Sequence, residues 1–549
     1  MPKHQERNSL DSSSMRRKFH FLKAIALRSG SLGIGLFILL NVQLNIRQSA
    51  AQAKNAFRSR PANIIFAQQP SSPNTEPALC PDRLENAIET VINRPEFSRE
   101  RWGILIQRVS RGDTLYSRDA EKYFVPASNL KLFTTAAALQ QLGAQFRIRT
   151  SVYPTSKDGL RIVGRGDPSL TDAQLKELAQ QLSQRGVSPI SQAIATHDYF
   201  RGPNVNPSWE LGDVHADYGA PVNSSILNQN VVKLSLVPQQ IGQPLRVNWS
   251  DPIAAKQWQI DNEAIAVSSA TSSVNVSRES KKLVLKITGQ LAIDAQPESV
   301  SLAVVDPDEY FLQHFRHALV AAGIQEILGT SRFVQVVRAD RLKLSSVFEQ
   351  LEKEKFSQLF NELAFVESPP LAELLKETNQ NSNNLYAEAL LRVLGARVGK
   401  LRSFTDSTAQ MGLQVVKETL AKLGVDSSGY VMADSSGLSR HNLATPEAIA
   451  QTLRVMAKSP LAAVYRASLP VAGISGTLEN RFRNTAAEGI VQAKTGTLSG
   501  AVALSGYIEP ANYEPLVFSI IVNQSNRPSA ALRQASDRIV LLLTRLRRC

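Results

Sequence analysis

The chain has 549 residues, of which 43% are hydrophobic, 20% are charged and only two are cysteines, and its formal net charge is +14. This length supplies a large core and two to four domains, and the composition excludes a disordered chain, a collagen-like repeat and a small disulfide-rich domain. A basic chain suits an anionic partner such as a membrane surface or an acidic wall polymer. A nucleic-acid partner is not expected, because no basic block is interleaved with aromatic residues.

The N-terminal segment has the three parts of an export signal. Residues 15–19 are basic, residues 31–40 form an apolar run, and small residues end in Ala51-Gln52-Ala53. The pair Arg16-Arg17 leaves open whether the twin-arginine route is used. The apolar run is short for a spanning helix of about 20 residues, although an uncleaved anchor remains an alternative. We predict that residues 1–53 are an export signal that directs the chain to the periplasm or an extracytoplasmic wall space.

A low-complexity stretch separates this signal from the folded region. Residues 54–79 are rich in Gln, Ser, Asn and Pro without periodicity, which predicts a flexible linker. Cys80 follows the linker, and Cys549 is the last residue of the chain. In an oxidising compartment these two thiols could form one bridge that joins the chain ends. Because a sequence does not give the Cα separation that a disulfide needs, two unrelated thiols remain the alternative.

The folded region divides into three segments. Residues 80–149 are predicted to contain a helix over 81–97, strands at 102–106 and 114–116, and a helix from Ser128 to about residue 142. Residues 150–342 differ, because short β-rich runs, such as 283–287 and 334–337, alternate with Gly, Pro and Asn turns. Residues 343–549 are predicted to contain helices at 371–375, 385–394 and 408–423, strands at 490–497, 501–508 and 516–522, and a helix over 530–546.

The arrangement of these segments predicts a fold class. Helices and strands occur at both ends of the chain, so we expect one antiparallel sheet assembled from both ends and flanked by helices. Residues 80–149 and 343–549 would form this α/β (α+β) domain, and residues 150–342 would be a β-rich insertion into it.

The first motif with chemical meaning is Ser128-Asn129-Leu130-Lys131 at the start of a predicted helix. Residues i and i+3 lie on one helical face, so the Lys131 amine can reach the Ser128 hydroxyl. A helix N-terminus also supplies positive potential for a developing oxyanion. Alone this motif is weak, because a capping serine followed by a solvated lysine explains it equally well.

Two further motifs strengthen the first. Ser382-Asn383-Asn384 ends a polar stretch immediately before a helix, and Lys494-Thr495-Gly496 lies on a predicted strand followed by Thr497. Glycine at position 496 lets a ligand backbone approach the strand closely. S-x-x-K, S-x-N and K-T-G in this order are the signature of penicillin-binding proteins and serine β-lactamases.

With these motifs the chain resembles the class C low-molecular-mass penicillin-binding proteins, which are D-alanyl-D-alanine carboxypeptidases and endopeptidases of peptidoglycan. The resemblance runs from about Cys80 to the C-terminus and includes further stretches at residues 164–168, 218–221, 368–371, 437–442 and 473–478. It implies a serine β-lactamase/transpeptidase-like catalytic domain that is split by a large insert, itself made of two nested domains. The sequence departs from the family pattern at three positions, which puts specificity more than activity in question: Asn383, Ser435 and Ser475.

The resemblance also implies roles for the motif residues. Ser128 would form an acyl-enzyme, and Lys131 would take its proton once burial and the nearby charge of Lys494 had lowered the lysine pKa. Ser382 would pass this proton to the leaving amine, while Asn384 would hold Lys131 and the substrate amide.

The remaining roles implied by the family concern substrate binding. Lys494 and Thr495 would bind the terminal carboxylate, and the backbone N–H groups of Ser128 and Thr497 would form the oxyanion hole. In relatives an Asp, an aromatic residue and an Arg receive the diaminopimelyl side chain, whose charges they complement. The matching positions are Asp213, Tyr218 and Arg440.

We expect neither a metal nor another cofactor, because the histidines show no ligand spacing and the cysteines are far apart. The expected partners are peptidoglycan peptides that end in D-Ala-D-Ala or are cross-linked, with β-lactams as covalent inhibitors and peripheral membrane or wall association left open. The alternatives are a β-lactamase or esterase on the same framework and a non-catalytic wall-binding protein.

Overall fold

The computed structural model describes residues 77–155, 158–196, 199–269, 273–278, 283–327, 332–333, 362–400 and 406–549. The predicted export signal, all but the end of the linker and the strand predicted at 334–337 lie outside the described residues. No helix among the described residues is both long enough and apolar enough to cross a membrane.

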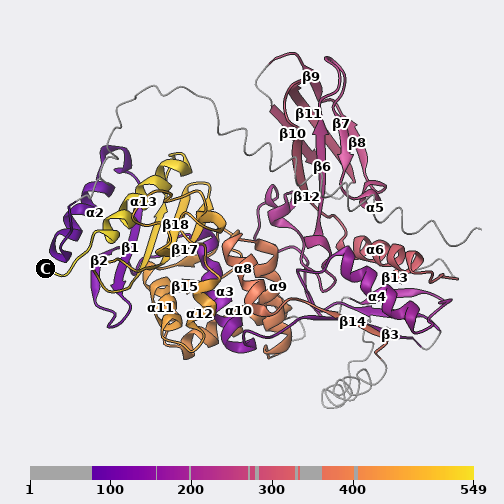
Figure 1. Cartoon of the computed structure of the whole chain (residues 1–549), viewed down its shortest axis with the longest axis horizontal. Helices are drawn as coiled ribbons and strands as arrows, with labels where there is room; N and C mark the ends of the chain where they lie inside the picture. Colours follow the sequence, from indigo (N-terminus) through magenta and orange to yellow (C-terminus); the bar gives the residue numbers. More distant parts are fainter. Residues whose placement is uncertain are drawn as a thin grey trace, which may run out of the picture. The chain divides into compact units, whose positions relative to one another are not determined.

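The central sheet is built from both ends of the chain, as the sequence predicts (Figure 1). Its strand order is β17–β18–β19–β1–β2, and every neighbouring pair is antiparallel. The strands are β1 (Arg101–Arg108), β2 (Thr114–Arg118), β17 (Val491–Leu498), β18 (Ala501–Ile508) and β19 (Leu516–Asn523). The join between the two ends is the pair β1 and β19, which runs from Arg101 opposite Asn523 to Arg108 opposite Leu516.

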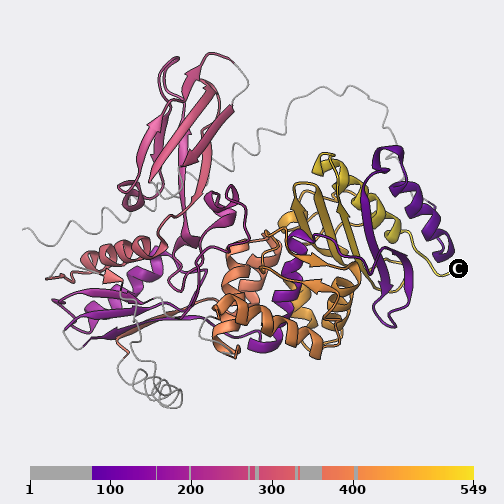
Figure 2. The same ribbon diagram turned by 180° about the vertical axis from the view of Figure 1, so that it is seen from behind.

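Helices cover both faces of this sheet (Figure 2). Every residue of β18 and β19 is buried, which accounts for their nearly continuous apolar sequences. One face packs against two helices, α2 (Leu84–Ile92) and α13 (Ser529–Thr544). The other face packs against a larger group of helices: α3 (Lys131–Leu142), α8 (Leu371–Gln380), α9 (Asn384–Arg397), α10 (Thr408–Lys422), α11 (Pro446–Ala457) and α12 (Ala462–Ala467).

The described residues of the inserted region form three sheets of their own. A five-stranded sheet in the order β13–β5–β4–β3–β14 packs with helices α4 (Asp172–Gln184) and α6 (Pro307–Ala321). Its strands are β3 (Arg149–Pro154), β4 (Leu160–Val163), β5 (Ala193–Thr196), β13 (Arg332–Phe333) and β14 (Ala364–Glu367). The other two sheets are formed by β6 (Val231–Val237), β7 (Arg246–Trp249), β8 (Gln259–Asn262), β9 (Ile265–Val267), β10 (Ser273–Arg278), β11 (Val284–Ala292) and β12 (Glu298–Ala303), with the short helix α5 (Pro252–Ala255) beside them.

Strand β14 lies close to the predicted boundary between the inserted region and the second catalytic segment. It pairs with β3, with Ala364 opposite Val152, and therefore belongs to a sheet of the inserted region. The sequence placed this strand in the second catalytic segment, predicted at 343–549. Helical periodicity returns only at Leu371. The sequence of the strand before it has no pattern that assigns it to the inserted region or to the catalytic domain.

The two ends of the folded region meet. Cys80 and Cys549 form a disulfide with a Cα separation of 5.8 Å. Beside it, the Leu79 amide donates to the carbonyl of Arg545 at 2.9 Å, and the Arg547 amide donates to the carbonyl of Leu79 at 3.1 Å.

Candidate active site

The first motif lies on a tight turn that leads into α3. Ser128 sits in the 3₁₀ turn η3 (Ala127–Leu130), and Lys131 is the first residue of α3. The sequence predicted a single helix from Ser128, but in a 3₁₀ turn residues i and i+3 are eclipsed, which brings the two side chains closer still. The Lys131 Nζ atom donates to Ser128 Oγ at 2.9 Å.

The other two motifs complete a short network around this pair. Lys131 Nζ also donates to Asn384 Oδ1 at 2.7 Å, at the start of α9. Lys494 Nζ, on β17, donates to Ser382 Oγ at 2.8 Å. The structure therefore brings all five predicted catalytic residues together, with one amine at each serine hydroxyl.

Close backbone contacts hold turn η3, which carries Ser128, in place. Ala127 has a φ of +47°, in the left-handed region that non-glycine residues rarely adopt. Gly437 packs against this turn, and a Cβ at that position would lie 1.9 Å from the Ala127 carbonyl oxygen. Gly496 of β17 approaches from another side, where a Cβ would lie 3.1 Å from the Ser128 nitrogen. Gly496 thus lets the strand and the nucleophile lie side by side.

Both lysines of the network are fully buried. Burial lowers the pKa of Lys131 to about 7, although the negative charges of Asp434 and Glu388 act in the opposite direction. Burial, followed by the like charge of Lys131, holds the pKa of Lys494 well below its ordinary value. Repulsion between two like charges acts on both lysines, so each amine disfavours the charged form of the other.

The substrate-side residues of the third motif lie at the edge of the sheet. Thr495 Oγ1 donates to Thr477 Oγ1 at 2.7 Å, and Thr497 is exposed. Because β17 is an edge strand, alternate backbone N–H groups point away from β18. Turn η3, with Ser128, contacts this strand.

Two of the three residues predicted to bind a substrate side chain are linked to each other and to Asn384, whereas Arg440 pairs with another residue. Tyr218 OH donates to Asp213 Oδ1 at 3.3 Å, and the Tyr218 carbonyl accepts from Asn384 Nδ2 at 2.9 Å. Arg440 Nε instead donates to Glu210 Oε1 at 2.6 Å. Sequence reasoning missed Glu210, although it lies only three residues before Asp213.

Three residues that contact or face Lys131 were also missed. The Ser436 carbonyl accepts from Lys131 Nζ at 2.6 Å. Glu388 and Asp434 are buried carboxylates whose charges act on the same lysine. A signal was present, since Glu388 is one of two charged residues in the otherwise apolar run at 385–394.

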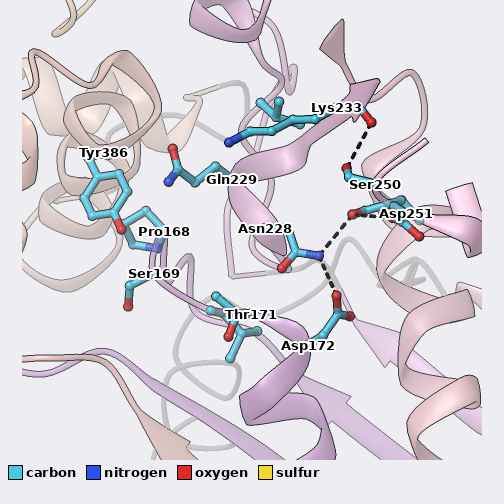
Figure 3. A pocket seen from close by; sticks show the side chains of 13 residues that line it. Pro168, Ser169, Thr171, Asp172, Asn228, Gln229, Lys233, Ser250, Asp251 and Tyr386 are labelled. Carbon is cyan, nitrogen blue, oxygen red and sulfur yellow. Dashed lines mark hydrogen bonds between the residues drawn. The ribbon is translucent and has the colours of Figure 1, made fainter. Parts of the chain in front are cut away.

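A separate polar pocket of about 350 Å³ lies beside the second motif (Figure 3). It is lined by residues of the inserted region and by Tyr386 of α9. Gln229 on its wall accepts at Oε1 from Asn383 Nδ2 at 2.8 Å, which ties the pocket to the S-x-N motif. In the part of the chain that the structure describes, no group of three His, Cys, Asp or Glu side chains could hold a metal ion.

Known proteins exist with a similar sequence and a similar fold. The family model of D-Ala-D-Ala carboxypeptidase 3 (S13) matches residues 84–546. A D-alanyl-D-alanine carboxypeptidase of Actinomadura sp. (strain R39) is 33% identical over 468 residues, which covers 81% of this chain and 82% of that protein. The crystal structure of penicillin binding protein 4 from Haemophilus influenzae superimposes with a TM-score of 0.67 at 23% identity, covering 83% of this chain and 99% of that one. A second structure of that protein, complexed with a β-lactam, gives a TM-score of 0.65 at 22% identity, with the same coverage.

Proposed function

The chain belongs to the S13 family of D-Ala-D-Ala carboxypeptidases and is a serine-type, penicillin-binding DD-peptidase, and from this premise we propose which of its residues carry the reaction. Ser128 is the nucleophile, Lys131 its general base, and Ser382, Asn384 and Lys494 complete the catalytic group. The observation that carries the assignment is the 2.9 Å contact between Lys131 Nζ and Ser128 Oγ, made by a lysine that is wholly buried. Burial favours the neutral amine, which is the form able to accept a proton.

The proposed reaction passes through an acyl-enzyme. Ser128 Oγ attacks the carbonyl carbon between two D-alanines while Lys131 accepts the hydroxyl proton. Ser382, whose hydroxyl accepts from Lys494, would give its proton to the leaving amine and take up the one that Lys131 had received, so that Lys131 becomes neutral again. The N–H groups of Ser128 and Thr497 would receive the oxyanion, and a water would later hydrolyse the ester.

Two parts of the site would bind the substrate. Lys494 and Thr495 would hold the terminal carboxylate, a partner that favours the protonated lysine. Asp213 and Tyr218, which share a hydrogen bond, would receive the ammonium group of a diaminopimelyl side chain. Arg440, whose Nε donates to Glu210 and whose Nη1 donates to the Ser499 carbonyl, would bind its carboxylate through another N–H group of the guanidinium.

We also propose where the enzyme works. The predicted signal at 1–53 and the disulfide between Cys80 and Cys549 both suit export to an oxidising compartment, where cross-linked wall peptides are the substrates. Peripheral attachment to membrane or wall would follow from an uncleaved signal or from the basic surface. A digest of purified peptidoglycan, analysed for released D-Ala and for opened cross-links, measures the two activities separately.

The assignment of the nucleophile is tested by mass spectrometry after incubation with benzylpenicillin. We expect one covalent adduct per chain on the peptide that carries Ser128, and none in Ser128→Ala. An adduct on another peptide overturns the assignment. Rapid turnover of nitrocefin would instead favour a β-lactamase, and the absence of any adduct a non-catalytic wall-binding protein.

A further inference from the structure

Glu388 is a buried acid that contacts neither serine of the site but supports the residues around Lys131. It lies on α9, one turn after Asn384, and only 1% of its surface is exposed. Its Oε1 atom accepts from the backbone N–H groups of Ser435 and Ser436, at 2.8 and 2.9 Å. Because the Ser436 carbonyl accepts from Lys131 Nζ at 2.6 Å, one carboxylate oxygen holds the loop that touches the base.

The charges around Glu388 are few. Arg392 lies one turn further along α9 and is also buried, with its guanidinium donating to the Pro203 carbonyl at 3.0 Å. Asp434, at the start of the same loop, accepts from the amides of Gly437 and Ser439 and from Trp209 Nε1. Lys131 and, behind it, Lys494 are the remaining charges of the cluster.

We propose that Glu388 is a positioning residue that holds the Ser436 carbonyl against Lys131, and that its negative charge sets the pH range in which Lys131 can act as a base. This inference rests on the proposed function of Lys131. Two backbone amides of adjacent residues converging on one buried oxygen is an arrangement that a solvent-facing glutamate could not maintain.

The direction of the charge effect follows from the neighbours. A negative charge near Lys131 favours the ammonium form and so raises the pH at which the lysine becomes neutral. Burial, then the charge of Asp434, raises the pKa of Glu388 to about 7, while Arg392 opposes this rise. The charged form of Glu388 favours the charged form of Lys131, so the protonation of the lysine depends on the protonation of this acid.

The test compares Glu388→Gln with Glu373→Gln, an exposed glutamate of α8 that pairs with Lys376. The rate of acylation by a fluorescent penicillin is measured from pH 5 to 9, with a thermal melt to check folding. Glutamine keeps an oxygen for the two amides but carries no charge, so we expect the rising limb of the profile to move down by about one pH unit with a similar plateau. Glu373→Gln should match the wild type. A folded Glu388→Gln variant whose limb does not move overturns the proposal.

Glu388→Asp provides an independent variant, which decides the matter if the glutamine variant does not fold. Aspartate keeps the charge but is one methylene too short to reach both amides, so the limb should stay in place while the plateau falls at least tenfold. An unchanged plateau would show that the two amide contacts do not position the base. A missing adduct at Ser128 in the wild type would count against the proposed function itself, not against this role of Glu388.

Discussion

At the scale of single residues, the site depends on two amines buried without an ion pair. Among the described residues, Lys131 and Lys494 donate to hydroxyl, amide and carbonyl oxygens and not to any carboxylate. Burying a charge without a counter-charge within hydrogen-bonding distance is costly, so each lysine is biased toward its neutral form. Packing thus favours the neutral form of Lys131 that the proposed mechanism needs, and a substrate carboxylate at Lys494 would restore the positive charge there.

Specificity can be tested at Asp213. We expect Asp213→Ala to reduce kcat/KM about tenfold for peptides with a diaminopimelyl side chain, because the ammonium group loses its charged partner. A simple acyl-D-Ala-D-Ala substrate, which lacks that side chain, should be hydrolysed at the wild-type rate. Steady-state kinetics with both substrates make the comparison, and equal losses would reject the pocket.

The residues of the site differ in how well a sequence can predict them. Ser128 and Lys131 are three positions apart, so local geometry alone brings them together, and Ser382 and Lys494 could be added because their motifs follow in a recognisable order. Glu210 and Glu388 could not be placed in the same way. Each meets its partner across a long separation, 230 residues for Glu210 and Arg440, and neither belongs to a motif.

At the scale of elements, the position of the nucleophile turn depends on Gly437. An alanine there would place a Cβ 1.9 Å from the Ala127 carbonyl oxygen, at a φ of +83°. We expect Gly437→Ala to lower the free energy of unfolding by about 3 kcal/mol and to abolish most acylation, because η3, which carries Ser128, must move away from residue 437. Urea denaturation and penicillin binding measure the two effects.

Gly424, which follows α10, is the matched control. It has a similar φ of +88°, but a Cβ there would meet nothing within 4 Å. Gly424→Ala should therefore cost only about 1 kcal/mol, from backbone conformation alone, and leave acylation unchanged. Equal effects of the two substitutions would show that conformation and not the close contact decides the cost.

The elements themselves were predictable where apolar spacing was continuous. Strand β18 has the predicted bounds, and α10 differs from its prediction by one residue at its end. The helix predicted over 81–97 is instead broken: α2 ends at Ile92, and Pro95 begins a separate 3₁₀ turn, because proline cannot donate to the preceding turn. Because apolar residues keep the same spacing on both sides of the break, apolar spacing alone does not reveal where the helix ends.

At the scale of the whole molecule, the catalytic domain closes on itself. Strand β19 pairs with β1, although more than 400 residues separate Arg101 from Asn523. Pairing β1 with β19 closes a loop that contains the inserted region and all three motifs, so this contact carries a high loop-closure entropy cost. The disulfide between Cys80 and Cys549 lies at the same join, with a sequence separation of 469 residues.

Removing this disulfide should destabilise the enzyme without changing its chemistry. A cross-link over so long a loop restricts the unfolded chain strongly, and we expect Cys549→Ser to lower the free energy of unfolding by about 3 kcal/mol. Leu79 and Leu546, next to the disulfide, pack with α2 and α13 on one face of the sheet. Helix α3, whose first residue is Lys131, lies on the opposite face. Acylation of Ser128 at 25 °C should therefore keep its wild-type rate.

The urea midpoint for loss of penicillin binding measures stability, and Cys80→Ser should reproduce the shift. Since both substitutions break one bond, the double variant should be no less stable than either single variant. A double variant as stable as the wild type would show that the cross-link does not stabilise the join.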